Sequence, residues 1–411
     1  MNLNTCQQEA YDKILAFLFN EEKYFILSGG PGHGKTYLAN YIYENLIRQY
    51  RHAISAIGDT PIYNSLYLTA TTNSAVDSLA SAGESNTIFS LLGLYVWQGN
   101  LKQRNSHAGG NILSPAVVII DEYTLIDDDL MGFIQSGLGN CKIIFMGDKD
   151  QLLAIKGISS ILGSMEPNHV LTIPQRTNDP DILHLIEEFK QLVHGNSIDE
   201  VPINNQSITH ITDEEFARLI WNPNTCFDNA RIITQTNADA IEINNDIREA
   251  KGLPDHFVVG EVVTNNTYVL IGKLAIGTDA DLIIENYHGN FTVDLGDELR
   301  EFPRYSVRRG NSEHTILHIS KQERDLILQS DQIPNYGRHF IEESCDIRST
   351  YASTIYKAQG RTFETVYINL SGFTGNTTRD VLVRSMFVAA SRAAKNVIFI
   401  GELHENLMRK L

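Results

Sequence analysis

Short apolar runs alternate with stretches of helical periodicity in the first part of the chain. Runs at 24–28, 66–70, 116–120 and 142–146 each predict a buried strand, and a helical pattern at 8–19 precedes the first of them. Strands that are apolar along their whole length and are separated by helices are typical of a parallel sheet covered on both faces. The pattern therefore predicts an α/β fold.

The same alternation returns in the second half of the chain. Runs at 230–234, 365–370 and 396–400 again predict strands, and 182–193 carries apolar residues at helical spacing. Between 258 and 344 this rhythm is replaced by strand-like alternation and by turn sequences such as YHGN. We therefore expect a second α/β domain that contains a β-rich insertion.

Length and composition agree with this division. A chain of 411 residues has room for two or three domains at roughly 150 residues each, and 42% hydrophobic and 20% charged residues are ordinary for a folded protein. The expected boundaries are 1–168 for the first domain with a hairpin insertion at about 94–115, 169–257 and 345–411 for the second domain, and 258–344 for its insertion.

Charge and cysteine content exclude some classes of protein. The net charge of −17, from 33 basic and 50 acidic residues, argues against a protein that coats nucleic acid through bulk positive charge, although a local basic groove stays open. The four cysteines show no CxxC spacing, so neither a zinc site nor a disulfide framework is indicated. The N-terminus is polar, and no apolar stretch approaches the ~20 residues of a membrane span. We expect a soluble, cytoplasmic protein with no membrane partner.

One loop carries a phosphate-binding pattern. The sequence GGPGHGKT at 29–36 matches G-x-x-x-x-G-K-[ST] in full, between a predicted strand and a predicted helix. Glycines in such a loop allow backbone N–H groups to converge on phosphate oxygens at a helix N-terminus. Lys35 is expected to reach the β- and γ-phosphates of a nucleotide, and the Thr36 hydroxyl to bind Mg²⁺; an ordinary glycine turn is the alternative. The glycines of the site would be Gly29, Gly32 and Gly34.

Acidic and amide side chains follow the next predicted strands. Asp121 comes at the end of the run VVIID, where a carboxylate can hold Mg²⁺, and Glu122 beside it can polarise an attacking water. The alternative is that these acids only open a solvated helix, because Asp127 to Asp129 follow. Gln151, in GDKDQL, is expected at the same sheet edge, where a glutamine can sense a γ-phosphate, although this motif alone also suits a plain loop.

Eight short motifs follow one another along the chain. They are LNTCQ (3–7), GGPGHGKT (29–36), TATTNSAV (69–76), DEYT (121–124), GDKDQL (147–152), LTIPQR (171–176), YASTIYKAQG (351–360) and FVAASRA (387–393). In order and spacing these motifs resemble superfamily 1 helicases of the 5′-to-3′ branch, similar to the phage Dda and RecD group. The resemblance implies two RecA-like P-loop domains that clamp ATP, a short β-hairpin pin inserted in the first and an SH3-like β-rich insertion in the second.

The resemblance also implies roles for side chains that the phosphate loop does not supply. Gln7 resembles the glutamine that reads adenine, with Gln8 as a substitute, and Gln151 matches the coupling glutamine of the family. Arg176 and Arg392 match arginines that the second domain points at the γ-phosphate. Arginine fingers neutralise charge in the phosphoryl-transfer transition state and contribute ~10³–10⁵ in rate. A lone arginine such as Arg176 is otherwise usually a surface residue.

Threonine-rich loops after predicted strands suit phosphate contacts through hydroxyl and backbone N–H groups. The loops TATTNS (69–74) and STIYK (353–357) have this composition, and Gly360 follows in the motif that links nucleotide to DNA in the family. Each threonine or asparagine can instead be a helix cap, because both are favoured there. The expected DNA contacts are Thr69, Thr71, Thr72, Asn73, Asn237, Thr354 and Lys357.

Aromatic residues lie near a predicted hairpin. Alternating aromatics before a GN turn, in LYVWQGNL at 94–101, predict two short antiparallel strands. The family implies a strand-separating pin here, so that Tyr95 or Trp97 would wedge the fork; packing of Trp97 into a small local core is the alternative. Phe89, in TIFS, is either a DNA contact or a core residue.

The resemblance implies an ATP- and Mg²⁺-dependent DNA helicase that translocates 5′ to 3′ and unwinds duplex in replication, recombination or repair. The alternatives are a translocase that displaces proteins, an RNA helicase, and a mediator that uses ATP only as a switch. The partners would be single-stranded DNA, forked duplex DNA and a single-strand-binding protein or other replication proteins. The Dda-like layout suggests a phage role in the cytoplasm of a bacterial host.

Overall fold

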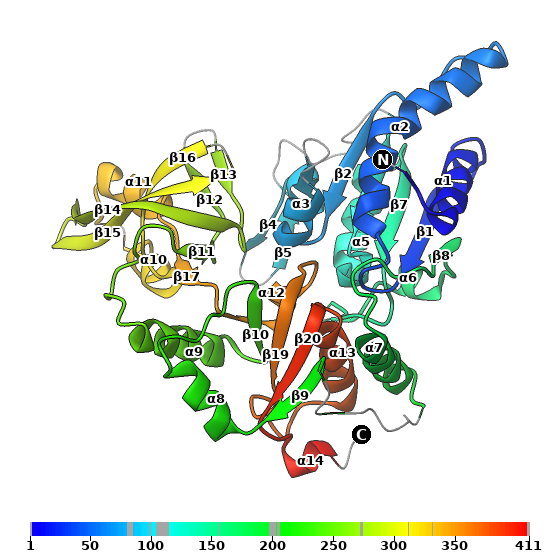
Figure 1. The fold of residues 1–411 in the computed structure, drawn as a ribbon. Coiled ribbons are helices and arrows are strands. Elements are labelled where there is room, and N and C mark those ends of the chain that lie inside the picture. Colours follow the sequence, from blue (N-terminus) through cyan, green and yellow to red (C-terminus); the bar gives the residue numbers. More distant parts are fainter. Residues whose placement is uncertain are drawn as a thin grey trace.

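The structure is a computed structural model, and it describes residues 2–79, 85–97, 100–103, 115–154, 156–196, 203, 206–271, 274–310, 312–330 and 332–408. Figure 1 shows two α/β units, each built on its own sheet, and a β-rich unit beside the second of them. In the described part of the chain, no helix combines the length and the apolar character needed to cross a membrane.

The first sheet has six parallel strands in the order β3-β2-β6-β7-β1-β8. Every residue of β6 and β7 is buried, which explains why these segments are apolar without interruption. The strands are β1 (Tyr24–Gly29), β2 (Leu66–Ala70), β3 (Ser85–Thr87), β6 (Val117–Asp121), β7 (Lys142–Gly147) and β8 (His169–Leu171).

Helices cover both faces of the first sheet. Phe25 packs with α1, α2 and α3 on one face, and its neighbour Ile26 packs with α4, α5 and α6 on the other. The first helix begins earlier than the helical pattern indicated, because Asn4 and Gln7 form a capping box. The helices are α1 (Thr5–Phe17), α2 (Lys35–Ala56), α3 (Asn73–Leu79), α4 (Ile88–Leu91), α5 (Asp128–Gly137) and α6 (Ser160–Ser164).

The first sheet extends past the boundary expected at residue 168. Strand β8 pairs in parallel with β1 and continues the sheet to Leu171. Only three residues long, this strand has exposed Val170 between two buried neighbours, so it forms no apolar run that the sequence pattern could reveal.

A small antiparallel hairpin lies where the pin insertion was expected. It consists of β4 (Leu94–Trp97) and β5 (Asn100–Gln103), with Trp97 opposite Asn100. Residues 104–114 of the expected insertion lie outside the described residues.

The second sheet has five parallel strands in the order β18-β10-β19-β20-β9. Helices α7 and α13 pack on one face of this sheet and α8 and α9 on the other, while α12 and α14 are short. The strands are β9 (Ile208–Ile211), β10 (Ala230–Thr234), β18 (Ala352–Thr354), β19 (Phe363–Asn369) and β20 (Ala393–Ile400). The helices are α7 (Pro180–Val193), α8 (Asp213–Ile220), α9 (Asn237–Ala250), α12 (Ile355–Ala358), α13 (Arg379–Ala390) and α14 (Glu405–Met408).

The β-rich unit contains an antiparallel sheet in the order β16-β15-β14-β11-β17 and a separate hairpin, β12-β13. Its last strand lies beyond residue 344, where the insertion was expected to end, and two helices not anticipated from the sequence follow β16. The elements are β11 (Val262–Asn265), β12 (Val269–Ile271), β13 (Leu274–Ile276), β14 (Asp281–Asp294), β15 (Leu299–Arg309), β16 (Ser312–Leu317), α10 (Lys321–Ile327), α11 (Asn335–Glu342) and β17 (Ile347–Ser349).

Candidate active site

The phosphate-loop sequence lies between β1 and the start of α2. Gly34 caps the helix with φ +79°, and Lys35 is the first helical residue. The Lys35 ammonium donates hydrogen bonds to the carbonyl oxygens of Gly29, at 2.6 Å, and Gly30, at 3.2 Å. Gly32 also has a positive φ, and a Cβ there would come within 2.5 Å of the Arg176 Cβ. A side chain would therefore disturb both the loop conformation and its contact with that arginine.

Two buried carboxylates lie at the same sheet edge. Asp121 ends β6 and Asp148 follows β7, the strand between β6 and β1. Burial raises the pKa of Asp121 to about 7, the charge of Glu122 adds to this effect, and the charge of Lys35 opposes it. Burial also raises the pKa of Asp148, again against the effect of Lys35. The phosphate loop therefore faces an acidic wall.

Glu122 adopts a conformation that is uncommon for a residue with a side chain. Its φ is +55°, in the left-handed region, at the start of the 3₁₀ turn η2 (Tyr123–Leu125). Such strain persists only where the surroundings hold it, and it concentrates at functional sites. The Glu122 carboxylate accepts a hydrogen bond of 3.1 Å from the Gln359 amide of the second unit. The two units thus meet at this carboxylate.

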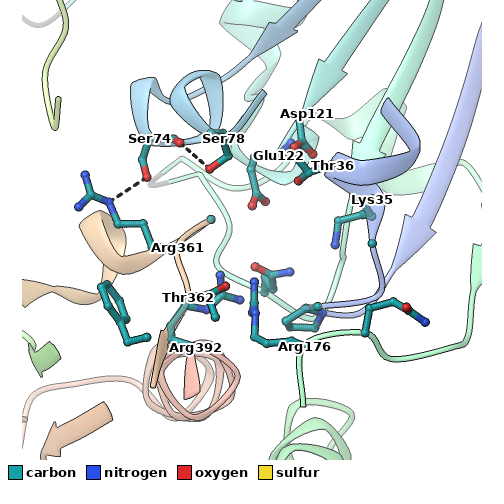
Figure 2. Close-up of a pocket in the computed structure, with 18 of the residues that line it drawn as sticks. Lys35, Thr36, Ser74, Ser78, Asp121, Glu122, Arg176, Arg361, Thr362 and Arg392 are labelled. Carbon is teal, nitrogen blue, oxygen red and sulfur yellow. Dashed lines mark hydrogen bonds between the residues drawn. The ribbon is translucent and has the colours of Figure 1, made fainter. Parts of the chain in front are cut away.

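Two arginines, the partly buried Arg176 and the buried Arg392, lie across the cavity from the carboxylates (Figure 2). Arg176 follows β8 on the connection to α7 and donates to the Ser391 carbonyl at 2.6 Å. Arg392 donates to the Val388 carbonyl at 3.1 Å and to the Ser391 hydroxyl at 2.8 Å. These contacts hold both guanidinium groups at the end of α13.

Burial dominates the electrostatics of both arginines. It lowers the pKa of Arg176 to about 9, and the positive charge of Arg392 adds to the shift. Burial also lowers the pKa of Arg392 to about 10, whereas the charges of Glu122 and Asp148 act in the opposite direction. Two adjacent buried cations are costly unless an anion balances them, so this wall favours an anionic ligand.

One cleft of about 940 Å³ lies between the two units, and its lining includes Lys35, Asp121, Glu122, Arg176 and Arg392. Thr36, Gln151 and Gly360 also line it. Gln151 donates to the Asp148 carboxylate at 3.4 Å, and among the described residues nothing bonds to its buried side-chain oxygen. Gln7 lies outside the lining of this cleft but next to the phosphate loop, where its amide donates to the Gly34 carbonyl at 3.4 Å.

Several predicted DNA contacts have other partners in the structure. The Thr69 hydroxyl is buried and donates to the Ile119 carbonyl at 2.7 Å, and the Thr71 hydroxyl donates to the Glu122 carbonyl at 3.0 Å. Both hydroxyls are therefore engaged at the sheet edge, and contact of these two residues with DNA phosphates stays a prediction.

Two more predicted DNA contacts, Lys357 and Phe89, have protein partners in the structure. The Lys357 ammonium donates to Asn266 and lies 3.4 Å from the Asp279 carboxylate, so the β-rich unit already engages it. Burial lowers the pKa of Lys357. Phe89 is partly buried against the core between the first sheet and α4 to α6, which favours the core interpretation.

Three further candidates line a second groove, of about 350 Å³. Thr72, Asn237 and Thr354 line the groove from both units. The Thr72 hydroxyl also accepts from the Ala75 backbone N–H at 3.2 Å, as a helix cap does. Asn73 contacts the β-rich unit instead, because a Cβ on Gly277 would come within 2.8 Å of its side-chain oxygen. Tyr95 is exposed on β4, and the Trp97 side chain lies outside the described part of the structure.

The arginines of this region that sequence reasoning missed include Arg231, Arg361 and Arg384. Arg231 lines the cleft from β10, is almost fully buried, and stacks over the Phe363 ring at 4.8 Å. A charged residue inside the apolar run 230–234 was the available signal. Arg384, on α13, donates to the carbonyls of Lys149 and Gln151 in the first unit, at 2.6 and 2.9 Å. No local pattern marks this contact.

Two family models match the chain, an AAA domain over residues 11–156 and a UvrD-like helicase C-terminal domain over residues 349–400. An uncharacterized protein of Acanthamoeba polyphaga mimivirus is 22% identical, over 97% of this chain and 100% of that protein. The RecBCD enzyme subunit RecD of Buchnera aphidicola is 27% identical over 52% of this chain, and the match spans 35% of that subunit.

Solved structures of Pif1 helicases share the fold. A Bacteroides Pif1 helicase in complex with ADP-AlF3 and single-stranded DNA has a TM-score of 0.57 at 15% identity, covering 99% of this chain and 94% of that one. Pif1 helicase from Candida albicans has a TM-score of 0.54 at 14% identity, covering 100% and 98%. The fold is therefore that of two RecA-like domains. Both family models thus match in chain order on this fold, and the chain is similar to RecD and, in its fold, to Pif1 helicases.

Proposed function

We propose that this chain is an ATP-dependent DNA helicase that translocates 5′ to 3′ on single-stranded DNA and separates duplex ahead of it. The observation that carries this proposal is the cleft in which Lys35 and the carboxylates of one unit face Arg176 and Arg392. A site whose two walls belong to different units makes hydrolysis depend on their approach. Nucleotide turnover can then drive opening and closing of the units.

The cleft side chains suit ATP hydrolysis in a defined way. Lys35 would bind the β- and γ-phosphates, Glu122 would orient the attacking water, and the two arginines would neutralise charge that develops on the transferred phosphoryl group. The unpartnered oxygen of Gln151 supports a role in sensing the γ-phosphate. Gly32 and Gly34 would keep the loop open to phosphate oxygens, and Gln7 would reach the base.

The residues at the phosphate-loop edge also fit a magnesium ion. The Thr36 hydroxyl and the Asp121 carboxylate are hard oxygen donors, and the pKa of Asp121 is raised by burial beside Glu122, an excess of negative charge that a cation would relieve. When bound, Mg²⁺ would neutralise phosphate charge during hydrolysis.

We place the DNA track along the groove that Thr72, Asn237 and Thr354 line, with Asn73 at its rim. Solved Pif1 helicase structures, one in complex with single-stranded DNA and one on unwinding of forked double-stranded DNA, support this substrate class. The hairpin of β4 and β5, with Tyr95 and Trp97, would separate the strands. We further propose that the β-rich unit is an SH3-like accessory insertion in the second RecA-like domain.

Polarity-resolved unwinding tests this function. The protein is mixed with ATP, Mg²⁺ and duplexes that carry either a 5′ or a 3′ single-stranded tail, and strand separation is followed by fluorescence. We expect ATP-dependent unwinding of the 5′-tailed duplex only, with ATPase activity stimulated by single-stranded DNA. A matched Lys35→Ala preparation controls for contaminating enzymes. ATP binding without DNA-stimulated turnover would reject the motor, and unwinding from the 3′ tail would reject the polarity.

A further inference from the structure

One side chain joins all three units of the molecule. Arg361 lies just after α12 in the second unit, and its Nε donates to the Ser74 hydroxyl of α3 at 3.3 Å (Figure 2). Its other nitrogens donate to the Asp281 carboxylate, at 2.9 and 3.1 Å, and to the Asp279 carbonyl, at 2.7 Å. A single guanidinium thus bridges the first unit and the β-rich unit.

Gln359, two residues before Arg361, is hydrogen-bonded to the Glu122 carboxylate, which faces the phosphate loop. Ser74 donates through its hydroxyl to the Gln359 carbonyl at 3.3 Å, and the Gln359 amide donates to Glu122 at 3.1 Å. Between them, Gly360 has φ +79° and lies against α3, so that its Cβ would be 3.9 Å from Ala75. A shift of Arg361 would therefore move the turn that positions Gln359 on Glu122.

The β-rich side of this junction is held in place. Asp279 has φ +66°, a left-handed conformation that is costly for a residue with a side chain and that precedes β14. The Thr264 hydroxyl donates to the Asp281 carboxylate at 2.8 Å. Lys357 approaches the Asp279 carboxylate at 3.4 Å. Asp279, in the turn before β14, and Asp281, at the start of β14, thus face two bases. These bases are Lys357 of α12 and Arg361 just after it.

The ion pair between Arg361 and Asp281 contributes little to the stability of the fold. The Asp281 side chain is 44% exposed, and pairs of this kind contribute little to the free energy of folding. Arginine differs from lysine because its planar fork can serve several acceptors in fixed directions. The Arg361 guanidinium here bonds to three acceptors from two other units, which indicates that its role is to hold these units in a fixed arrangement.

We propose that Arg361 is a positioning residue that couples the β-rich unit to ATP hydrolysis, acting from Asp281 through the Gln359 turn on Glu122. The inference rests on the proposed ATPase function. Movement of the β-rich unit, whose Asp281 also lines the cleft, would reach Glu122 through this junction.

The test compares Arg361→Ala, Asp281→Asn and the double variant in the full chain. The readouts are kcat for DNA-stimulated ATP hydrolysis and the Kd of a fluorescent ATP analogue. We expect kcat to fall roughly 10-fold in Arg361→Ala, within the ~5–150-fold range of couplings between sites, with the Kd changed less than about twofold. The double variant should equal Arg361→Ala, because residues that act through one path are not additive. Arg361→Lys should recover part of the rate, since it keeps the charge but not the fork.

Lys395→Ala is the matched control, because Lys395 forms an exposed ion pair with Glu364 within the second unit, at 3.0 Å. Unchanged kcat in Arg361→Ala, or an equal loss of kcat and nucleotide affinity, overturns the inference. If the fold-loss of kcat in the double variant equals the product of the two single-variant losses, the role assigned to Asp281 is wrong. If Arg361→Ala unfolds at a lower temperature than the wild type, Asp281→Asn and Ser74→Ala test the junction in its place. An unchanged kcat in both of these variants overturns the inference. A wild-type chain without ATPase activity rejects the proposed function instead.

Discussion

Replacement of Arg392 by alanine should reduce the rate of ATP hydrolysis much more than the affinity for nucleotide. The guanidinium is 2% exposed and held by Val388 and Ser391, with Glu122 and Asp148 as the nearby opposite charges. Burial lowers its pKa to about 10, a shift that costs a few kcal/mol at about 1.4 kcal/mol for each pKa unit. A group kept at that cost should act on an anion in the cleft.

The expected magnitude follows from its position. An arginine that neutralises charge in the phosphoryl-transfer transition state contributes ~10³–10⁵ in rate, or about 4–7 kcal/mol of the barrier. Lys35 and the backbone of the phosphate loop remain in Arg392→Ala to bind the ground state. We therefore expect hydrolysis to slow at least ~10³-fold, while nucleotide affinity falls less than about tenfold, which is about 1.4 kcal/mol.

Single-turnover hydrolysis and equilibrium binding of a fluorescent ATP analogue measure the two quantities. Arg392→Lys should be intermediate, because lysine keeps the charge but cannot bond to Val388 and Ser391 while reaching the cleft. Lys395→Ala, three residues away on the exposed surface, should match the wild type. Equal losses of rate and affinity in Arg392→Ala would contradict the finger role, and so would an unchanged rate.

Three further predictions follow from the site and the hairpin. Lys35→Ala should abolish ATP turnover, as measured by phosphate release, and full activity would refute the phosphate assignment. Because burial raises the pKa of Asp121 to about 7, its carboxyl group takes up a proton as pH falls through that value, so Mg²⁺ affinity should drop by about tenfold per pH unit below it. The same shift should make the free energy of unfolding rise as pH falls from about 7 towards 4, because only the folded state then binds the extra proton. Isothermal titration with Mg²⁺ measures the affinity, and denaturant unfolding measures the stability. A Mg²⁺ affinity that does not change between pH 5.5 and 8 would exclude the shift. Trp97→Ala should spare single-strand-stimulated ATPase activity while reducing unwinding of forked duplex, and a parallel loss of both would make Trp97 a structural residue.

The parts of the fold that the sequence predicted are those with local causes. The runs that became β6 and β7 are apolar because both faces of these strands are covered, and this leaves a continuous signal. The phosphate loop was recognisable because its glycines, Lys35 and Thr36 must occur at fixed spacing between a strand and a helix. Asp121 was recognisable because it ends a buried strand at the same sheet edge.

Short strands and side-chain directions escaped prediction. Strand β8 joins the first sheet and β17 the β-rich sheet, each beyond the expected boundary, because three residues carry too little periodicity to reveal a partner. Thr69 and Thr71 have the composition of phosphate contacts, yet their hydroxyls bond to backbone carbonyls of the first unit. Composition indicates what a side chain can bind, whereas packing decides which way it faces.

The sequence by itself thus determined the two α/β halves, the phosphate loop and the acids beside it, since each depends on neighbours within a few residues. Only the tertiary structure decided how the halves communicate. Gln359 meets Glu122 across 237 residues of chain, and Arg361 meets Ser74 across 287. No local pattern can specify such pairs, because they form only when the three units pack against one another.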